Sequence, residues 1–323
     1  MAGLAGAAVA WPLVAQAQAT RRVPRVGVLW HAASAEEEAV YLAAVRRGLS
    51  DLGYVEGQNI ILDHRFPAEV PERFVSLAAE LAASKVDVLV AINRTAALAA
   101  QRATKTIPVV FVAVADPVGS QLVASLARPG GNITGLSNMA LDLTAKRLEF
   151  LTLVVPGLRR IALIVNGNDT GGSRRYIEEC WPAAERLKVA LDPVEIRAPG
   201  DLQPAFSAMA GSGVDGVVVT QDGLFFVTRQ DIAFLALRHR LPSIVYSRET
   251  AEAGALASYG PDNQGIFRRT GVYVDRILKG ASPSDFAVEQ PTTFQLIVNL
   301  KTARALNIEI PPTLLARADE LIE

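Results

Sequence analysis

Residues 86–114 read VDVLVAINRTAALAAQRATKTIPVVFVAV, and this stretch indicates the fold class. Residues 86–92 and 108–114 are apolar runs with the length of buried strands. Between them, residues 95–104 are rich in alanine and have the length of a helix. Strands that are apolar throughout, and not only at alternate positions, are typical of parallel sheets covered by helices on both faces. The stretch therefore predicts a strand–helix–strand unit of an α/β domain.

The same alternation continues on both sides of this unit and restarts after residue 140. Further predicted strands are 26–30, 59–66, 161–165, 189–196, 216–220 and 243–246. Further predicted helices are 36–52, 70–84, 119–126, 143–154, 172–187, 202–211 and 228–239. Two successive series of this kind predict two doubly wound parallel-sheet lobes.

Composition agrees with two folded lobes and excludes several classes of protein. At about 150 residues per domain, the 323 residues suggest two domains. Half of the residues are hydrophobic, and 32 Lys and Arg against 33 Asp and Glu give a net charge of −1. This balance is too apolar for a disordered chain and too neutral for a protein that binds mainly nucleic acid. No nucleic-acid partner is expected.

Motifs of enzymes and metal proteins are missing from the sequence. Cys180 is the single cysteine, which excludes an intrachain disulfide and CxxC-type zinc sites. The three histidines do not form HExxH, and no GxSxG, GxxxxGK[ST] or strand-linked GxGxxG motif occurs. The glycine-rich stretch at 129–135 is interpreted as a turn or hinge. We therefore expect no catalytic residues, no metal and no cofactor.

The N-terminal segment resembles an export signal. Residues 2–15 read AGLAGAAVAWPLVA, and small-x-small steps follow at 15–19. The run is too short for a membrane span, which needs about 20 apolar residues. Residues 1–19 are thus predicted to be a signal peptide, which predicts a periplasmic location. No Lys or Arg precedes the apolar run, so the natural start is expected upstream. A buried N-terminal helix is the alternative.

The predicted strand ends indicate where a ligand binds. In open α/β sheets the carboxyl ends of the strands line a crevice. Amide, hydroxyl, charged and aromatic side chains gather there, a set suited to a small polar or amphipathic solute. The candidates are Trp30, His31, Ser34, Asn93, Arg94, Thr95, Asp116, Asn166, Asn168, Asp169, Gln221, Asp222, Tyr246, Ser247, Arg248 and Tyr259. For each, the alternative is ordinary loop or helix-capping duty, notably for Asn93, Thr95 and Asp169.

Several strings resemble one bacterial family. The most specific are DPVG at 116–119 and LVASLARPGGNITG at 122–135. Supporting strings are LGYVEGQN at 52–59, TIPVVF at 106–111, YGPD at 259–262 and KTARALNIEIP at 301–311. Together they resemble the substrate-binding proteins of ABC transporters, whose relatives include a tryptophan-binding lipoprotein. The resemblance covers nearly the whole chain after the signal peptide.

This resemblance implies a type I periplasmic binding fold with a ligand held between two lobes. It implies three crossover strands, expected here near 132–137, 255–259 and 287–293. The N-terminal lobe would then comprise 24–134 plus 259–288, and the C-terminal lobe 135–258 plus 289–323. It also implies a monomer that partners an inner-membrane ABC permease and its ATPase.

Two positions depart from the family pattern. After the third strand, relatives usually have Gly followed by Thr or Ser and Pro, where this chain has Asn93, Arg94 and Thr95. Gln121 likewise replaces a glycine. The ligand of the relatives is therefore not transferred to this chain.

Three functions remain open at this point. The first is a periplasmic solute-binding protein that takes an amino acid or organic acid and closes around it. The second is a ligand-sensing domain of the same fold, and the third an α/β enzyme. Arg94 precedes a predicted helix N-terminus and could clamp a ligand carboxylate; the alternative is a pair with an acidic residue across the cleft.

Overall fold

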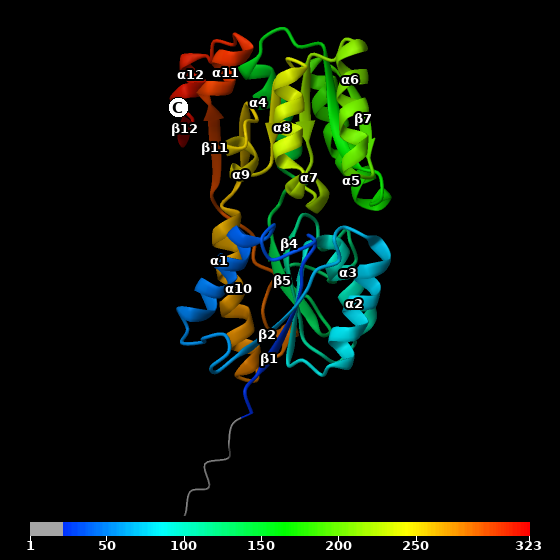
Figure 1. The fold of residues 1–323 in the computed structure, drawn as a ribbon, viewed down its shortest axis with the longest axis vertical. Helices are drawn as coiled ribbons and strands as arrows, with labels where there is room; N and C mark the ends of the chain where they lie inside the picture. Colours follow the sequence, from blue (N-terminus) through cyan, green and yellow to red (C-terminus); the bar gives the residue numbers. More distant parts are fainter. Residues whose placement is uncertain (1–21) are drawn as a thin grey trace, which may run out of the picture.

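The computed structural model describes residues 22–323, and the chain there forms two lobes (Figure 1). Each lobe is built on one β-sheet with helices on both faces. The prediction of a two-lobed α/β fold is thus confirmed. The predicted signal peptide, 1–19, lies outside the described residues.

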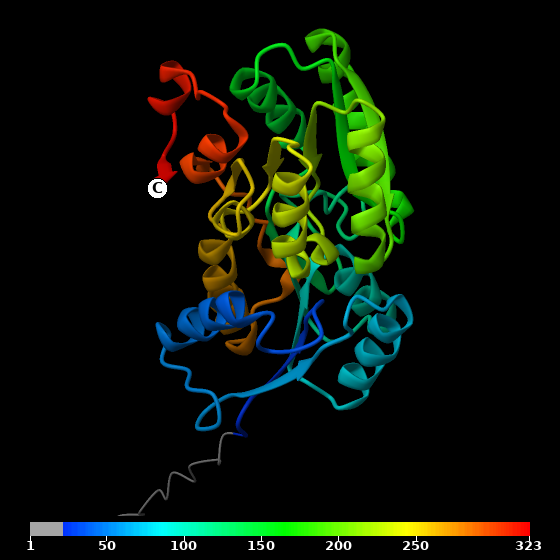
Figure 2. The same ribbon diagram turned by 45° about the horizontal axis from the view of Figure 1, so that its top comes forward.

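The first lobe contains a five-stranded parallel sheet in the order β2-β1-β3-β4-β5. Helices α2 and α3 cover one face, while α1 and α10 lie side by side on the other (Figure 2). The strands are β1 Arg25–Leu29, β2 Ile61–Arg65, β3 Val88–Ile92, β4 Val109–Val114 and β5 Ile133–Ser137. The helices are α1 Ala39–Ser50, α2 Pro71–Ala83, α3 Asn93–Ala103 and α10 Asn263–Leu278.

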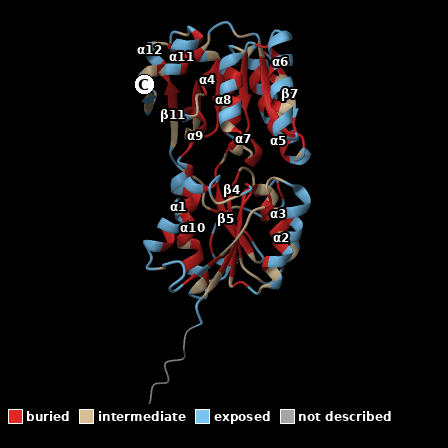
Figure 3. Cartoon of the chain, in the orientation of Figure 1, coloured by how far each residue is buried: buried red, intermediate tan, exposed pale blue. Residues whose placement is uncertain are grey.

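The apolar strands bury both of their faces, as a parallel sheet requires. In β3, Val88 and Val90 pack under α1 and α10, while Leu89 and Ala91 pack under α2 and α3. Successive side chains of a strand point to opposite faces. Because both faces are covered, every position of β3 is apolar and buried, and the strands of both sheets are mostly buried (Figure 3).

The second lobe contains a seven-stranded sheet in the order β12-β11-β10-β9-β8-β6-β7. Its strands are β6 Arg160–Asn166, β7 Ala190–Ile196, β8 Gly216–Val219, β9 Ser243–Val245, β10 Ala257–Pro261, β11 Phe294–Asn299 and β12 Glu320–Ile322. Its helices are α4 Thr144–Val154, α5 Thr170–Leu187, α6 Leu202–Gly211, α7 Gly223–Val227, α8 Arg229–Arg238, α9 Arg248–Glu252, α11 Leu300–Leu306 and α12 Pro312–Leu315.

The chain passes between the lobes three times. The connections follow β5, follow β10, and run through 287–293 into β11. The first two therefore come just after the positions 132–137 and 255–259 expected from the sequence. Because β10 leads to the first lobe and β11 returns from it, the two neighbouring strands are antiparallel. The second sheet is thus mixed, whereas the sequence predicts a wholly parallel one.

A buried arginine joins two of these connections. Arg147 in α4 is fully buried, and its guanidinium donates to the carbonyl oxygens of Tyr259 (2.9 Å) and Ala140 (3.3 Å). Ala140 lies in the first connection and Tyr259 in β10, ahead of the second. Burial lowers the pKa of Arg147 to about 10. These bonds fix the two connections to each other at the base of the second lobe.

The predicted helix at 119–126 is wrong. The segment forms turns, because the Asp116 carboxylate accepts from the Gly119 N–H (2.8 Å) and Gln121 has a φ of 58°. That left-handed backbone is one that glycine adopts more readily than glutamine. No helix is predicted beyond residue 246, although the chain there forms α9, α10, α11 and α12.

Across residues 22–323, the helices are each too short or too polar to cross a membrane.

Candidate functional site

Two pairs of strand ends face each other between the lobes. The strand order reverses between β1 and β3 in the first sheet and between β6 and β8 in the second. At such a switch point, the loops after the two strands separate and leave a crevice. His31 follows β1 and Asn93 follows β3, while Asn166 ends β6 and Asp222 comes shortly after β8. The cleft of this chain lies between these four positions.

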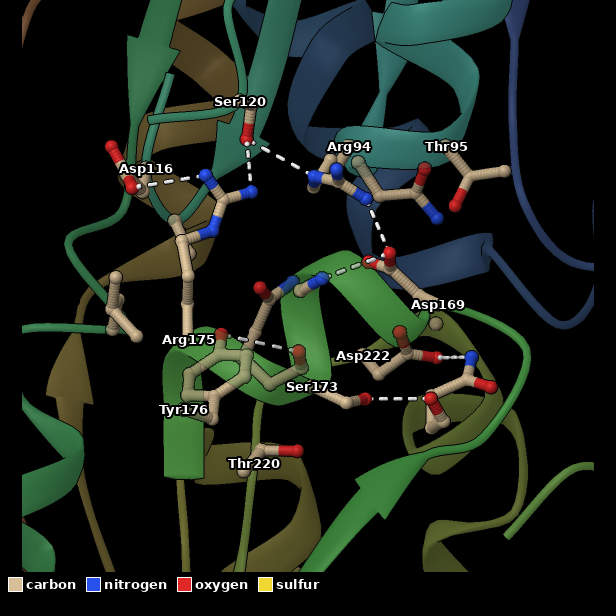
Figure 4. A pocket seen from close by; sticks show the side chains of 17 residues that line it. Arg94, Thr95, Asp116, Ser120, Asp169, Ser173, Arg175, Tyr176, Thr220 and Asp222 are labelled. Atoms are coloured by element: carbon tan, nitrogen blue, oxygen red, sulfur yellow. Dashed lines mark hydrogen bonds and ion pairs between the residues drawn. The ribbon is translucent and has the colours of Figure 1, made fainter. Parts of the chain in front are cut away.

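The larger part of the cleft, the charged compartment, has a volume of about 540 Å³ including its opening to solvent. Figure 4 shows side chains of both lobes pointing into it. From the first lobe it is lined by Asn93, Arg94, Thr95, Ala115, Asp116, Ser120 and Leu141. From the second it is lined by Asn166, Asp169, Gly172, Ser173, Arg175, Tyr176, Thr220, Gln221, Asp222 and Gly223.

Reciprocal ion pairs cross this compartment. Arg94 of the first lobe pairs with Asp169 of the second, and Arg175 of the second pairs with Asp116 of the first, at 3.4 Å (Figure 4). The Ser120 hydroxyl accepts from both guanidinium groups, at 3.1 Å from Arg94 and 3.2 Å from Arg175. Each lobe thus contributes one arginine and one aspartate to the contact between them.

Local capping fixes several of these residues. Asn93 Oδ1 accepts from the Ala96 N–H (3.0 Å), and Asp169 Oδ1 accepts from the Gly172 N–H (3.1 Å). Asn93 and Asp169 therefore cap backbone N–H groups, as the alternative interpretation expected. Both residues also line the cleft. Asn93 has a φ of 75°, a conformation that asparagine tolerates better than most residues.

An aromatic compartment adjoins the charged one; its volume is about 330 Å³ including open solvent, and the space left free between its side chains is about 20 Å³. The two share the lining residues Asn93, Gln221, Asp222 and Gly223. The other lining residues are His31, Tyr41, Ile92, Ala113, Asn138, Phe226, Tyr246, Asn263 and Phe267. The Tyr41 ring stacks on Phe267 with centroids 4.2 Å apart and on Phe226 at 4.8 Å. This part of the cleft suits an apolar, planar group.

A buried histidine with two carboxylates forms one wall of the aromatic compartment. His31 Nε2 lies 3.1 Å from Glu38 Oε1, and Nδ1 lies 2.9 Å from Glu69 Oε1. Burial alone lowers the pKa of His31, but the Glu38 charge and the hydrogen bond to Glu69 outweigh it and raise the pKa to about 9. Burial also raises the pKa of Glu38. His31 is therefore an imidazolium at neutral pH.

The same histidine lies against the second lobe. A Cβ at Gly223 would lie 2.0 Å from Glu69 Oε1 and 2.8 Å from His31 Nδ1. A larger residue at 223 would therefore hold the lobes apart. The two lobes meet here through the backbone of Gly223.

Asp222 is the acidic group shared by both compartments. Its Oδ1 accepts from Asn166 Nδ2 (2.8 Å) and from the Leu224 N–H (2.9 Å), which caps α7. Burial, followed by the charge of Glu69, raises the pKa of Asp222 to about 7 in spite of these bonds. Three carboxyl groups, those of Glu38, Glu69 and Asp222, act on His31, so the region favours an added cation.

The structure brings together many of the residues predicted for the crevice. These are His31, Asn93, Arg94, Thr95, Asp116, Asn166, Asp169, Gln221, Asp222 and Tyr246. His31 does not lie in an exposed loop, because its side chain is buried.

Trp30 does not reach the cleft. It is fully buried in the core under α1 and α10, where it stacks between Phe66 and Phe267 and donates to His64 Nδ1 (2.9 Å). The physical reason is strand alternation, since Trp30 shares its face with Val28.

Ser34, Asn168 and Ser247 also lie outside both compartments. The Ser34 hydroxyl accepts from the Glu37 N–H (3.4 Å), and Asn168 Nδ2 donates to the Arg197 carbonyl (2.7 Å). These are local loop contacts. The Ser247 hydroxyl is buried 3.0 Å from that of Thr250.

The side chains of Tyr259 and Arg248 contact other parts of the second lobe and do not reach the cleft. The Tyr259 ring packs against Phe150 of α4, with centroids 4.7 Å apart. Arg248 pairs with Glu320, which attaches β12 to α9. Neither residue lines the cleft.

Sequence reasoning missed cleft residues of two kinds. Arg175 and Tyr176 lie in the second turn of α5, so they could have been found by extending the search one turn into the helix. Tyr41, Asn263 and Phe267 come from α1 and α10. Their approach to the cleft depends on the return of α10 to the first lobe, for which the sequence carries no local signal.

The cleft holds no evident reaction centre in the described chain. The Ser173 and Thr220 hydroxyls donate to backbone carbonyl oxygens, at 2.6 and 2.8 Å, and the Ser120 hydroxyl accepts from arginines. Over residues 22–323, His, Cys, Asp and Glu side chains form no group of three or more arranged to hold a metal ion. These hydroxyl groups are therefore engaged in hydrogen bonds and none is paired with a general base.

Comparisons with known proteins agree with this geometry. Residues 34–322 match the family model described as ABC transporter substrate binding protein. A tyrosine-binding protein of Clostridioides difficile (strain R20291) is 28% identical over 264 residues, which is 81% of this chain and 75% of that protein.

Two solved structures resemble this chain to different degrees. An ABC domain from Streptococcus pneumoniae in complex with L-Trp is 26% identical, covers 93% of this chain and 99% of its own, and superimposes with a TM-score of 0.84. The ligand-free, open structure of a substrate-binding protein with adhesive properties from Clostridium difficile has the same identity and coverage but a TM-score of 0.66. The predicted type I periplasmic binding fold is confirmed.

Proposed function

Because the chain belongs to the ABC transporter substrate-binding protein family, we propose that it is the solute receptor of an importer. On this proposal it captures one amino acid with an aromatic side chain in the cleft between its lobes. The observation that carries the proposal is the union of a charged and an aromatic compartment through Asn93, Gln221, Asp222 and Gly223. A ligand that fills both must be amphipathic.

Charge favours an amino acid over a simple organic acid. Asp222, next to Glu69 and Glu38, supplies acid in excess of the His31 cation, so a ligand ammonium group completes the local charge balance. An organic acid would bring a further negative charge to this wall. Asp222 is accordingly the partner we assign to the ligand ammonium.

Arg94 and Arg175 are the partners we assign to the ligand carboxylate. Both project into the charged compartment, and both are paired with aspartates across the cleft. A bound carboxylate would replace or share an aspartate as the partner of one guanidinium, since a planar fork accommodates carboxylates in this way. We therefore keep the proposal that Arg94 binds the ligand carboxylate, with Asp169 as its partner when no ligand is bound.

The lobes are proposed to close around the ligand as a hinge. Similarity to the L-Trp complex, at a TM-score of 0.84, exceeds that to the ligand-free open structure, at 0.66, which supports a closed arrangement here. The relatives bind tyrosine and L-Trp, which supports the aromatic class. A monomer in the periplasm that delivers its ligand to a permease and ATPase completes the proposal.

Native mass spectrometry tests this function without choosing a ligand in advance. The protein is unfolded, freed of ligand, refolded and mixed with equal amounts of the common amino acids, simple organic acids and sugars. We expect one aromatic amino acid per chain. Selection of a sugar or an organic acid, or no selection at all, would contradict the proposal.

A further inference from the structure

Asn263 has an unusual position in the aromatic compartment. It is the first residue of α10, directly after the second connection between the lobes, and it is 7% exposed. It lines the aromatic compartment beside Phe267, one turn further along the same helix. Its Oδ1 is buried, and no hydrogen-bond donor reaches it from the described residues. A buried amide oxygen in this condition is unfavourable until a donor arrives.

Other amides in the same wall already have partners. Asn93 Oδ1 accepts from the Ala96 N–H at 3.0 Å, and Asn138 Oδ1 accepts from the Ala140 N–H at 3.2 Å. These two side chains serve the fold, since each caps a turn of its own backbone. Asn263 does not, because the cap of α10 is the neighbouring Asp262, whose Oδ1 accepts from the Gly265 N–H at 3.0 Å.

The two phenol groups of the aromatic compartment do not serve Asn263. The Tyr41 hydroxyl, which belongs to the same compartment, is 3.1 Å from Glu249 Oε2 and donates to it. The Tyr246 hydroxyl is 3.4 Å from the carbonyl oxygen of Asp222. Both phenols of the wall are therefore directed to acceptors other than Asn263.

We propose that Asn263 is a specificity residue whose amide oxygen accepts a hydrogen bond from the side chain of the bound amino acid. The inference rests on the proposed function. In this orientation the charged groups of the ligand lie among Asp222 and the arginines. The ring of the ligand lies in the aromatic compartment. An indole N–H or a phenol O–H can supply the missing bond and a phenyl ring cannot. The site therefore prefers tryptophan or tyrosine to phenylalanine.

The expected size of the preference follows from the unpaired oxygen. A site built to hydrogen-bond a ligand group discriminates against the analogue that lacks it, because a buried polar atom is then left without a partner. For one neutral hydrogen bond we expect the better of L-Tyr and L-Trp to bind roughly tenfold more tightly than L-Phe.

Calorimetric titration of wild type and of Asn263→Leu with L-Tyr, L-Trp and L-Phe tests the proposal. Leucine keeps the branching of the side chain, is somewhat larger, and removes the amide. The preference over L-Phe should fall to about one in Asn263→Leu, with L-Phe affinity unchanged or higher. Gln58→Leu, which removes an exposed amide in the loop before β2, should keep the wild-type preference.

Thermal unfolding of the ligand-free variants separates specificity from folding. If Asn263 has no structural bond to lose, Asn263→Leu should melt at or above the wild-type temperature. Asn263→Ala gives the same comparison if the leucine variant does not fold.

The outcomes distinguish this inference from the function on which it rests. Equal wild-type affinity for all three ligands, or a preference that survives in Asn263→Leu, overturns the role of Asn263 alone. A failure of all three to bind wild type overturns the proposed function and this inference with it.

Discussion

Arg94 in the first turn of α3 and Asp169 at the N-cap of α5 form an ion pair that joins the two lobes across the cleft. Arg175 and Asp116 form a second pair in the opposite sense, at 3.4 Å. The side chains of these residues keep between 19% and 28% of their accessible surface, so solvent screens both pairs. Such contacts can bias closure of the lobes without locking it.

Weakening this contact should open the free protein. Asp169→Asn removes one interlobe charge, so we expect a larger radius of gyration by small-angle scattering without ligand, at low salt. High salt should have a similar but smaller effect on wild type. Glu178→Gln removes an exposed ion pair within α5 and serves as the control. Identical scattering of Asp169→Asn and wild type at every salt concentration would show that the pair does not bias closure.

Arg94→Ala should weaken ligand binding more than Asp169→Asn does. Loss of a charge-assisted hydrogen bond to the ligand carboxylate corresponds to about 1.5–3 kcal/mol, or roughly ten- to a hundredfold in affinity. If Arg94 acts only through Asp169, both substitutions should change the affinity equally. Calorimetric titration with L-tyrosine separates the two cases, and thermal unfolding of free Arg94→Ala controls for folding.

Ligand affinity should rise with pH between 6 and 8. The pKa of Asp222 is raised to about 7, so the carboxylate that pairs with a ligand ammonium is mostly protonated at pH 6 and mostly ionised at pH 8. From these ionised fractions we expect roughly a tenfold gain in affinity. Asp222→Asn should bind weakly and lose this dependence. A wild-type affinity that is constant from pH 6 to 8 would contradict the role of Asp222.

Stability of the ligand-free protein should fall as the pH rises from 6 to 9. His31 has a folded-state pKa of about 9, above its ordinary value of 6.5, because Glu38 and Glu69 outweigh burial. A raised histidine pKa contributes stability that is fully present below 6.5 and lost as the pH rises through 9. A shift of this size corresponds to roughly 3 kcal/mol.

The raised pKa of Asp222 also makes the free energy of unfolding fall as the pH rises, but over a lower pH range than His31. A carboxyl with a raised folded pKa contributes stability below its ordinary value of 3.8 that is lost as the pH rises through 7. Urea unfolding at constant ionic strength should therefore show a continuous decline from pH 6 to 9. In His31→Gln the free energy of unfolding should change less with pH above pH 7 than it does in wild type. A wild-type curve that is level over this range would contradict the charged state assigned to His31.

The sequence predicted the fold and much of the charged compartment because both depend on local rules. Apolar strands such as β3 require cover on both faces, and the carboxyl ends of parallel strands meet at one edge of the sheet. Asn93, Asp116 and Asp222 could be found in this way. Trp30 could have been excluded by the same reasoning, since it shares its strand face with Val28.

The side of the aromatic compartment that α1 and α10 supply could not be predicted, because it depends on tertiary contacts. Asn263 and Phe267 reach the cleft only because α10 returns to the first lobe and packs against α1. Gly48 and Gly271 allow that approach, since a Cβ at Gly48 would lie 1.8 Å from the backbone oxygen of Arg268. Nothing local in the α10 segment indicates which face meets a ligand.

Calorimetric titration of refolded, ligand-free wild-type protein tests the central claim most directly. The syringe contains L-tyrosine or L-tryptophan, or the matching acid without the amino group, 3-(4-hydroxyphenyl)propionate or indole-3-propionate. We predict saturable binding of one amino acid per chain and at least tenfold weaker binding of the deaminated acid, because Asp222 then lacks its cation. No binding of either amino acid, or equal affinity for amino acid and acid, would contradict the account.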